Sequence, residues 1–199
     1  ESNMENANSP KPKGSSPLPY SHLLDLLDTR RKQVLKFDAF LRDETDWLNA
    51  PASSRENFHL AYEGGLVKHS VGVTETLLKL REILAPDLSP ESCVIAGLYH
   101  DLGKAGLPGQ PYYLPNQDQW MVKNRGINYI INKELVHMDI ATRSLFLISS
   151  HVALSPEEAQ AIRYHDGQYI QENKSVAHRE CKLTRLLQYA DNWTAGVLE

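Results

Sequence analysis

Apolar residues recur at intervals of three and four along most of this chain, a spacing typical of helices that bury one face. The spacing predicts one or two helices between Ser21 and Leu48 and another helix from about Leu66 to Leu84. A further helix is predicted from Pro90 to about Lys104, because Ser89 is a favourable N-cap and proline is favoured at the first helical position.

The second half of the chain returns to the same spacing. A helix is predicted to begin at about Glu134. Ser155 then starts another helix, since proline follows it and Glu158 stands at the capping-box position. That helix is expected to close at Gly167. The last predicted helix runs from about His178 to Val197.

Residues 109–132 depart from the helical pattern. Two aromatic stretches, Tyr112–Leu114 and Trp120–Val122, predict a β-hairpin, and Asn128–Ile131 predicts a third short strand. We interpret the segment as an inserted flap, although an irregular covering loop would explain the same residues equally well. The fold is therefore predicted to be all-α, a helical bundle with a small inserted β-hairpin.

Composition narrows the class of protein. Residues 1–19 are rich in Ser, Asn, Pro and Lys and lack periodicity, so we expect a disordered tail before one domain at residues 20–199. The formal net charge is −4, which argues against non-specific binding of nucleic acids or membranes. There are two cysteines and no CxxC pair, which suits a reducing cytoplasm. No apolar run reaches the length of a membrane span.

Histidines and aspartates supply the candidate chemistry. One inward-facing histidine is usually a satisfied core residue, but six inward-facing ligand-type side chains are hard to bury without a cation. Imidazole and carboxylate without thiolate favour Fe, Mn, Co, Ni or Zn over Ca or Mg. The side chains predicted to face inward from five helices are His69, His100, Asp101, His137, His165 and Asp191.

Segments around these residues resemble the HD-domain superfamily of metal-dependent hydrolases, whose pattern is His … His-Asp … Asp. Tyr62–Ser70 (YEGGLVKHS) is similar to the first-histidine segment of bacterial and phage members, and His100–Lys104 (HDLGK) is similar to their signature. Tyr189–Asp191 (YAD) resembles the closing aspartate segment. Ala161–Gly167 (AIRYHDG) resembles the later histidine segment of the subset that holds two metals. The resemblance covers about residues 55–195.

The resemblance implies two divalent transition-metal ions, most often Fe or Mn, with Ni, Co or Zn as alternatives. The first ion would be held by His69, His100 and Asp191 together with Asp101. His137 and His165 would hold the second ion, and Asp101 would bridge the pair. Asp166, which lies beside the glycine at a predicted helix end, is expected to be a surface cap.

The resemblance also implies a metal-dependent phosphohydrolase that uses a metal-activated water on a small phosphate ester, with a nucleotide as the expected substrate. Asp101 and Lys104 are the predicted catalytic residues, the lysine holding a phosphate as its counterpart does in related enzymes. Lys104 could instead only compensate the dipole at a helix C-terminus. Weaker candidates for substrate contact are His59, Lys68 and Arg163; His59 could equally be a loop histidine.

Two other functions are compatible with the same residues. HD-type diiron oxygenases, similar to myo-inositol oxygenase, use the same kind of ligand set but consume O₂. A catalytically degenerate HD fold could serve as a binding module, although such a role does not require a complete ligand set. Dependence of turnover on O₂ separates the first alternative from a hydrolase.

Overall fold

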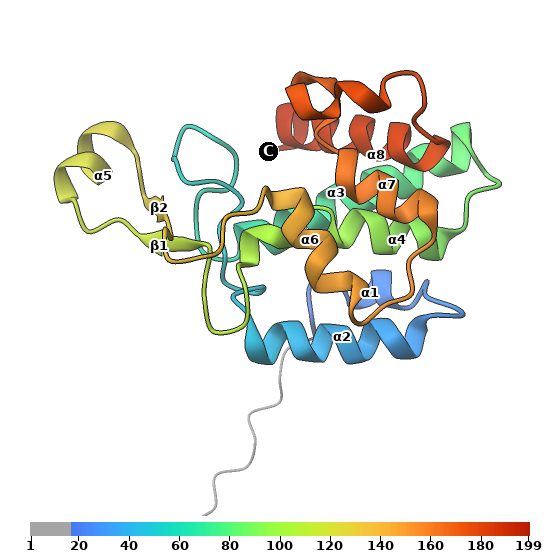
Figure 1. Ribbon diagram of the computed structural model, residues 1–199, viewed down its shortest axis with the longest axis horizontal. Helices are drawn as coiled ribbons and strands as arrows, with labels where there is room; N and C mark the ends of the chain where they lie inside the picture. The colour runs from blue at the N-terminus through green and yellow to red at the C-terminus, as the bar shows by residue number, and fades with distance from the viewer. Residues whose placement is uncertain (1–16) are drawn as a thin grey trace, which may run out of the picture.

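The computed structural model describes residues 17–199, so most of the predicted N-terminal tail lies outside the described residues. Two helices, α1 (Ser21–Leu24) and α2 (Arg31–Glu44), account for the first predicted helical stretch. Figure 1 shows them along one edge of the bundle. The predicted all-α fold with a small hairpin is confirmed, with corrections to individual elements.

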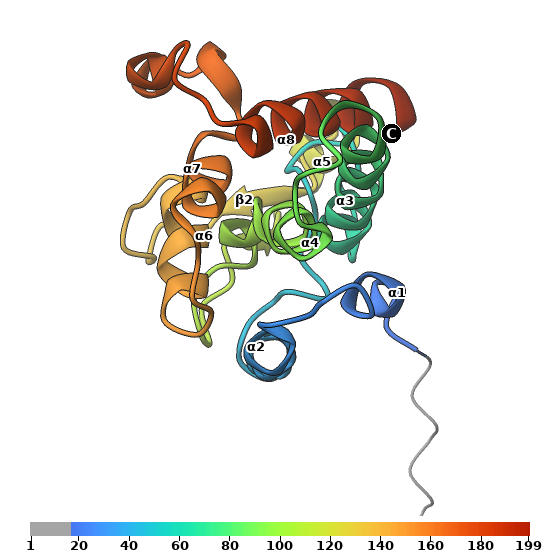
Figure 2. The same cartoon turned by 90° about the vertical axis from the view of Figure 1, so that its right-hand side faces the viewer.

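The central helix of the bundle is α4 (Pro90–Tyr99), and its residues from Cys93 to Tyr99 are buried. It packs against α3 (Gly65–Leu84), α7 (Pro156–Tyr164) and α8 (Lys182–Trp193). Figure 2 shows α4 in the middle, with α3 on one side, α7 on the other and α8 across the top. This arrangement directs the ends of several helices toward one region.

The helix that begins at Pro90 ends earlier than predicted. The α-helix stops at Tyr99, and a 3₁₀ turn at Leu102–Ala105 replaces its expected last turn. Tight packing on α6 (Ile140–Ser149) accompanies this change: the backbone N–H of Gly103 donates to Ser144 Oγ at 2.8 Å. A Cβ on Gly103 would lie 2.2 Å from the Ile140 carbonyl oxygen, so only glycine fits there.

The inserted segment contains one antiparallel strand pair, β1 (Tyr113–Pro115) and β2 (Tyr129–Ile131), in which Leu114 pairs with Ile130. It projects from one side of the bundle in Figure 1. The predicted strand at Trp120–Val122 is wrong, because these residues lie in helix α5 (Gln119–Arg125). Asp118 caps that helix by accepting a hydrogen bond from the backbone N–H of Met121. The aromatic side chain of Trp120 had suggested a strand.

The helix predicted from Glu134 begins only at Ile140. Asp139 is its N-cap and accepts from the backbone N–H of Thr142 at 2.7 Å, which leaves the preceding residues in a loop. The predicted capping box at Ser155 is confirmed. Two 3₁₀ turns, Gly167–Tyr169 and Gln171–Val176, follow α7.

The chain ends in a π-turn, Thr194–Leu198, that continues α8. The last predicted helix therefore begins later than expected, at Lys182, and its final turn is a π-turn rather than an α-helical one. Within residues 17–199, no helix combines the length and the apolar character needed to cross a membrane.

Candidate metal centre

Four helices bring five of the predicted ligands together. His69 lies near the start of α3, and Asp191 lies near the end of α8. His100 is the C-cap residue of α4, His165 is the C-cap residue of α7, and Asp101 follows His100 directly. The three histidines and Asp101 are buried.

Two overlapping groups of this cluster are compact enough to hold an ion: His69 with His100 and Asp101, and His100 with His165 and Asp191. His69 Nε2 lies 3.3 Å from His100 Nε2, 3.5 Å from Asp101 Oδ2 and 3.1 Å from Asp191 Oδ1. His100 Nε2 lies 3.7 Å from the same oxygen of Asp101 and 3.8 Å from that of Asp191. Ligand atoms about 2.1 Å from a shared ion lie about 3.0 Å apart at a right angle and about 3.4 Å apart at a tetrahedral angle. The distances from His69 therefore suit a shared transition-metal ion, and the longer distances from His100 would have to shorten by a few tenths of an ångström.

Backbone carbonyls orient two of the imidazoles for metal binding. His100 Nδ1 lies 2.7 Å from the Gly97 carbonyl oxygen, and His165 Nδ1 lies 2.8 Å from that of Ile162. A carbonyl oxygen only accepts hydrogen bonds, so each Nδ1 carries the hydrogen. Each Nε2 then faces the cluster with its lone pair available in the neutral ring, the arrangement usual for metal-bound histidines.

The two oxygens of Asp101 face different imidazoles. Oδ2 is on the side of His69 and His100, whereas Oδ1 lies 3.2 Å from His165 Nε2. Asp166 Oδ1 lies 3.5 Å from the same nitrogen. A carboxylate placed in this way can bind one ion with each oxygen.

Neighbouring positive groups keep the two aspartates of the cluster ionised. Lys104 Nζ donates to Asp101 Oδ2 at 2.6 Å, and its side chain is 13% exposed. Burial would raise the pKa of Asp101, but Lys104 and His100 outweigh burial and hold that pKa well below its usual range. Burial would likewise raise the pKa of Asp191, yet the hydrogen bond with His69 lowers it to about 2. Both aspartates are therefore ionised at neutral pH and available to a cation.

The three histidines differ in their affinity for protons. Burial lowers the pKa of His100 to about 4. Burial also disfavours the charged forms of His69 and His165, but the neighbouring carboxylates, Asp191 beside His69 and Asp101 beside His165, raise both pKa values to about 9. A metal ion would replace the protons that these two imidazoles hold at neutral pH.

Four members of the cluster, His69, Asp101, His165 and Asp191, line a cavity of about 870 Å³. Among the described residues that line it, Lys104 is the only lysine or arginine. Tyr169 and Tyr189 add aromatic surface, and Gln188 adds an amide. A second cavity of about 490 Å³ adjoins it, and the two share Ile140 and Asp166 as lining residues.

His137 is the predicted ligand that the structure does not bring to the cluster. It does not lie on the inward face of a helix, because α6 begins three residues later, and its side chain is exposed. It lines the second cavity. The capping of α6 by Asp139 is the local reason, since it fixes the helix start after His137.

The three weaker candidates have different positions. Lys68 is exposed and donates to the hydroxyl of Tyr62 at 3.1 Å. Arg163 donates to Asn173 Oδ1 at 3.2 Å and lines the second cavity. His59 lines the large cavity, and its ring centroid lies 4.9 Å from that of His69.

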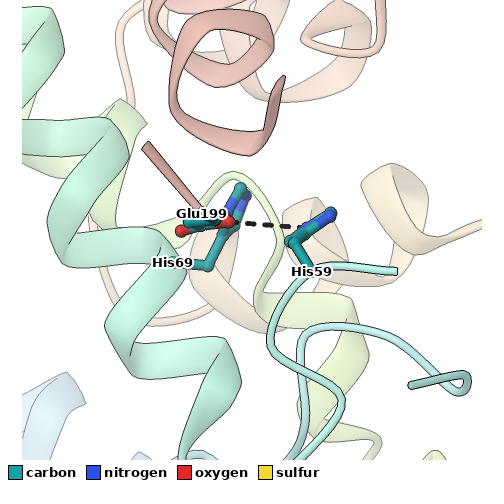
Figure 3. Close-up of side chains that lie close together, drawn as sticks. All are labelled: His59, His69 and Glu199. Atoms are coloured by element: carbon teal, nitrogen blue, oxygen red, sulfur yellow. Dashed lines mark hydrogen bonds and ion pairs between the residues drawn. The ribbon is translucent and has the colours of Figure 1, made fainter. Parts of the chain in front are cut away.

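Sequence reasoning missed two acidic residues near the cluster. Glu199 places its carboxylate beside His69 and faces His59 (Figure 3), with Oε2 3.1 Å from His69 Nδ1. Helical spacing gave no signal for Glu199, because eight residues of α-helix after Asp191 make about 2.2 turns and would not return to the same face. Asp166, expected to be a surface cap, is half exposed but lies beside His165, and its place next to a histidine in the sequence was the available signal.

Comparison with known proteins gives one match. A family model described as HD domain matches residues 66–196, a range that contains all five clustered residues. No curated protein and no solved structure matches the chain significantly.

Proposed function

The chain belongs to the HD-domain family, and from this premise we propose that it is a metal-dependent phosphohydrolase whose substrate is a small phosphate ester. The observation that carries the proposal is the convergence of three imidazoles and two carboxylates, of which His69, Asp101, His165 and Asp191 line one cavity. Such a donor set suits Fe, Mn, Co, Ni or Zn. When bound, the ions would activate a water molecule and offset the charge that develops on a phosphoryl group.

We assign the first ion to His69, His100, Asp101 and Asp191, whose ligand atoms have the mutual spacing described above. His165 and the second oxygen of Asp101 would hold the second ion, with Asp166 within reach. For His137 to bind that ion as predicted, the loop between Asn132 and Asp139 would have to move toward the large cavity.

Lys104 is the proposed phosphate-binding residue. It is a nearly buried cation that opens onto the large cavity and faces the bridging carboxylate. A lysine at this position can bind a phosphoryl oxygen and keep the ester next to the metal ligands. His59, on the same cavity wall, would make a further contact with the substrate.

A nucleotide is the substrate we propose. The cavity volume of about 870 Å³ lies within the range typical of small-molecule sites and exceeds what a phosphate alone requires. Tyr169 and Tyr189 supply aromatic faces on which a base could stack, and Gln188 contributes an amide for base edges.

The test is reconstitution of the purified full chain with Mn²⁺ or Fe²⁺, followed by an anaerobic panel of phosphate monoesters and diesters that includes nucleotides. We expect hydrolysis that requires the metal and proceeds without O₂. Asp101→Ala is the matched inactive control. Turnover that strictly requires O₂ would support an oxygenase instead, and metal binding without turnover of any substrate would support a binding module.

A further inference from the structure

Glu199 makes a close contact on the side of His69 opposite the metal-ligand cluster. Its two carboxylate oxygens lie 3.2 and 3.1 Å from His69 Nδ1, whereas His69 Nε2 faces Asp191 and His100. The backbone at Glu199 is exposed, but its side chain is only 6% exposed. The carboxylate is thus directed inward, and the two ring nitrogens of His69 meet carboxylates from the same C-terminal segment.

The π-turn explains how this segment supplies both carboxylates. Eight residues separate Asp191 from Glu199, and eight residues of α-helix would make about 2.2 turns and carry Glu199 past the face of Asp191. A π-turn uses more residues per turn, so the Thr194–Leu198 turn brings Glu199 back toward that face. Such turns are rare and are found frequently at functional sites.

Contacts with α3 hold the π-turn in place. Thr194 is buried, and its hydroxyl lies 3.2 Å from that of Thr76. Gly72, one turn after His69, faces the same segment: a Cβ there would lie 3.1 Å from Thr194 Cγ2 and 3.9 Å from Glu199 Oε1. Helix α3, which carries His69, therefore also positions Glu199, the residue that contacts Nδ1 of His69.

We infer that Glu199 is a positioning residue for His69, and this inference rests on the proposed metal-dependent function. A carboxylate only accepts hydrogen bonds, so it holds the ring hydrogen on Nδ1 and leaves Nε2 for the ion. His100 and His165 receive the same help from backbone carbonyls. Glu199 adds a full negative charge, which makes the His69 imidazole a stronger donor to a metal.

His59 lies next to this contact and lines the large cavity. Its Nε2 lies 3.9 Å from Glu199 Oε2, the contact that Figure 3 marks with a dashed line. Less solvent around the carboxylate strengthens its interaction with His69. The group His59, His69 and Glu199 is also compact enough to hold an ion itself, so the test must separate a positioning role from direct ligation.

The test compares metal binding by the wild-type chain (residues 1–199) with that by Glu199→Ala and Glu199→Gln. Mn²⁺ affinity is measured by competition with a chromogenic chelator, and the number of ions per chain is measured by elemental analysis. Glu82→Ala is the control, since Glu82 is exposed on the same helix α3. Thermal unfolding in the presence of a chelator reports whether each variant is folded.

For Glu199→Ala we expect the same number of ions but a 10- to 100-fold weaker affinity for one of them, the usual effect of losing an outer carboxylate. Glu199→Gln should lie between alanine and wild type, because an amide oxygen accepts the same hydrogen bond without the charge. Wild-type affinity in both variants would overturn the inference, and so would loss of a whole ion, which would make Glu199 a ligand. A wild type that binds no metal would overturn the proposed function itself.

Discussion

Replacing Asp101 with alanine removes a carboxylate whose two oxygens face the two proposed metal positions. Its Oδ2 lies 2.6 Å from Lys104 Nζ and 3.5 Å from His69 Nε2, and its Oδ1 lies 3.2 Å from His165 Nε2. We expect Asp101→Ala to lose both ions, because each ion loses a ligand and the negative charge between them disappears. Hydrolysis should fall to the level of the metal-free protein.

The same substitution has a measurable effect on stability. Lys104 is 13% exposed and would remain as a nearly buried cation without its partner. Breaking a buried ion pair from one side typically costs about 3–5 kcal/mol. A domain is stable by about 5–15 kcal/mol, so the variant should stay folded but unfold at a clearly lower urea concentration. Adding Lys104→Met removes the unpaired charge and should recover most of that loss.

The assay is urea unfolding followed by circular dichroism, with a chelator present so that metal loss does not contribute. Elemental analysis and a phosphatase assay are run on the same samples. Asp43→Ala, an exposed aspartate on α2, is the control and should change none of the three readouts. Near-normal turnover by Asp101→Ala would refute the catalytic assignment. A double variant no more stable than Asp101→Ala would refute the ion-pair argument.

Other predictions concern the second ion, pH and the helix scaffold. His165→Ala should bind about one ion per chain where wild type binds two, as measured by elemental analysis; the same loss in His137→Ala would show that its loop moves toward the cavity. Apparent metal affinity should rise from pH 7 toward pH 9 and then level off. Burial lowers the pKa values of His69 and His165, but neighbouring carboxylates outweigh burial and raise both to about 9, so below that pH the metal must displace a proton from each ring. A flat profile of affinity against pH in chelator competition would contradict this. Arg30→Ala should lower the free energy of unfolding in urea by about 3–5 kcal/mol, because the Arg30 side chain bonds the buried carboxylates of Glu91 and Glu158; an unchanged midpoint would show that these carboxylates do not depend on Arg30.

Features set by neighbours in the sequence were predictable from the sequence alone. The start of α7 is one example: Ser155 and Glu158 cap each other within three residues, so no distant part of the chain takes part. The start of α4 at Ser89 and Pro90 has the same local cause. The inward facing of His69 also follows from its place between apolar residues one turn away, because helical periodicity alone decides it.

Competition between local signals defeated other predictions. The aromatic residue Trp120 suggested a strand, but the cap at Asp118 and a left-handed Gly126 closed a short helix instead. Asp139 caps α6 and leaves His137 in a loop, although the apolar spacing allowed an earlier start. In both places a side-chain cap outweighed the periodicity.

The sequence by itself indicated which histidines and aspartates lie inward, and hence most of the proposed ligands, although His100, Asp101 and His165 lie at helix ends rather than on helix faces. Tertiary structure decided how they meet. Three contacts depend on helix packing and join segments far apart in the chain. They are the 3.3 Å approach of His69 to His100, the contacts of the two Asp101 oxygens with different histidines, and the contact of Glu199 with His69. No local pattern records such distances, because they arise only when α3, α4, α7 and α8 pack around one another.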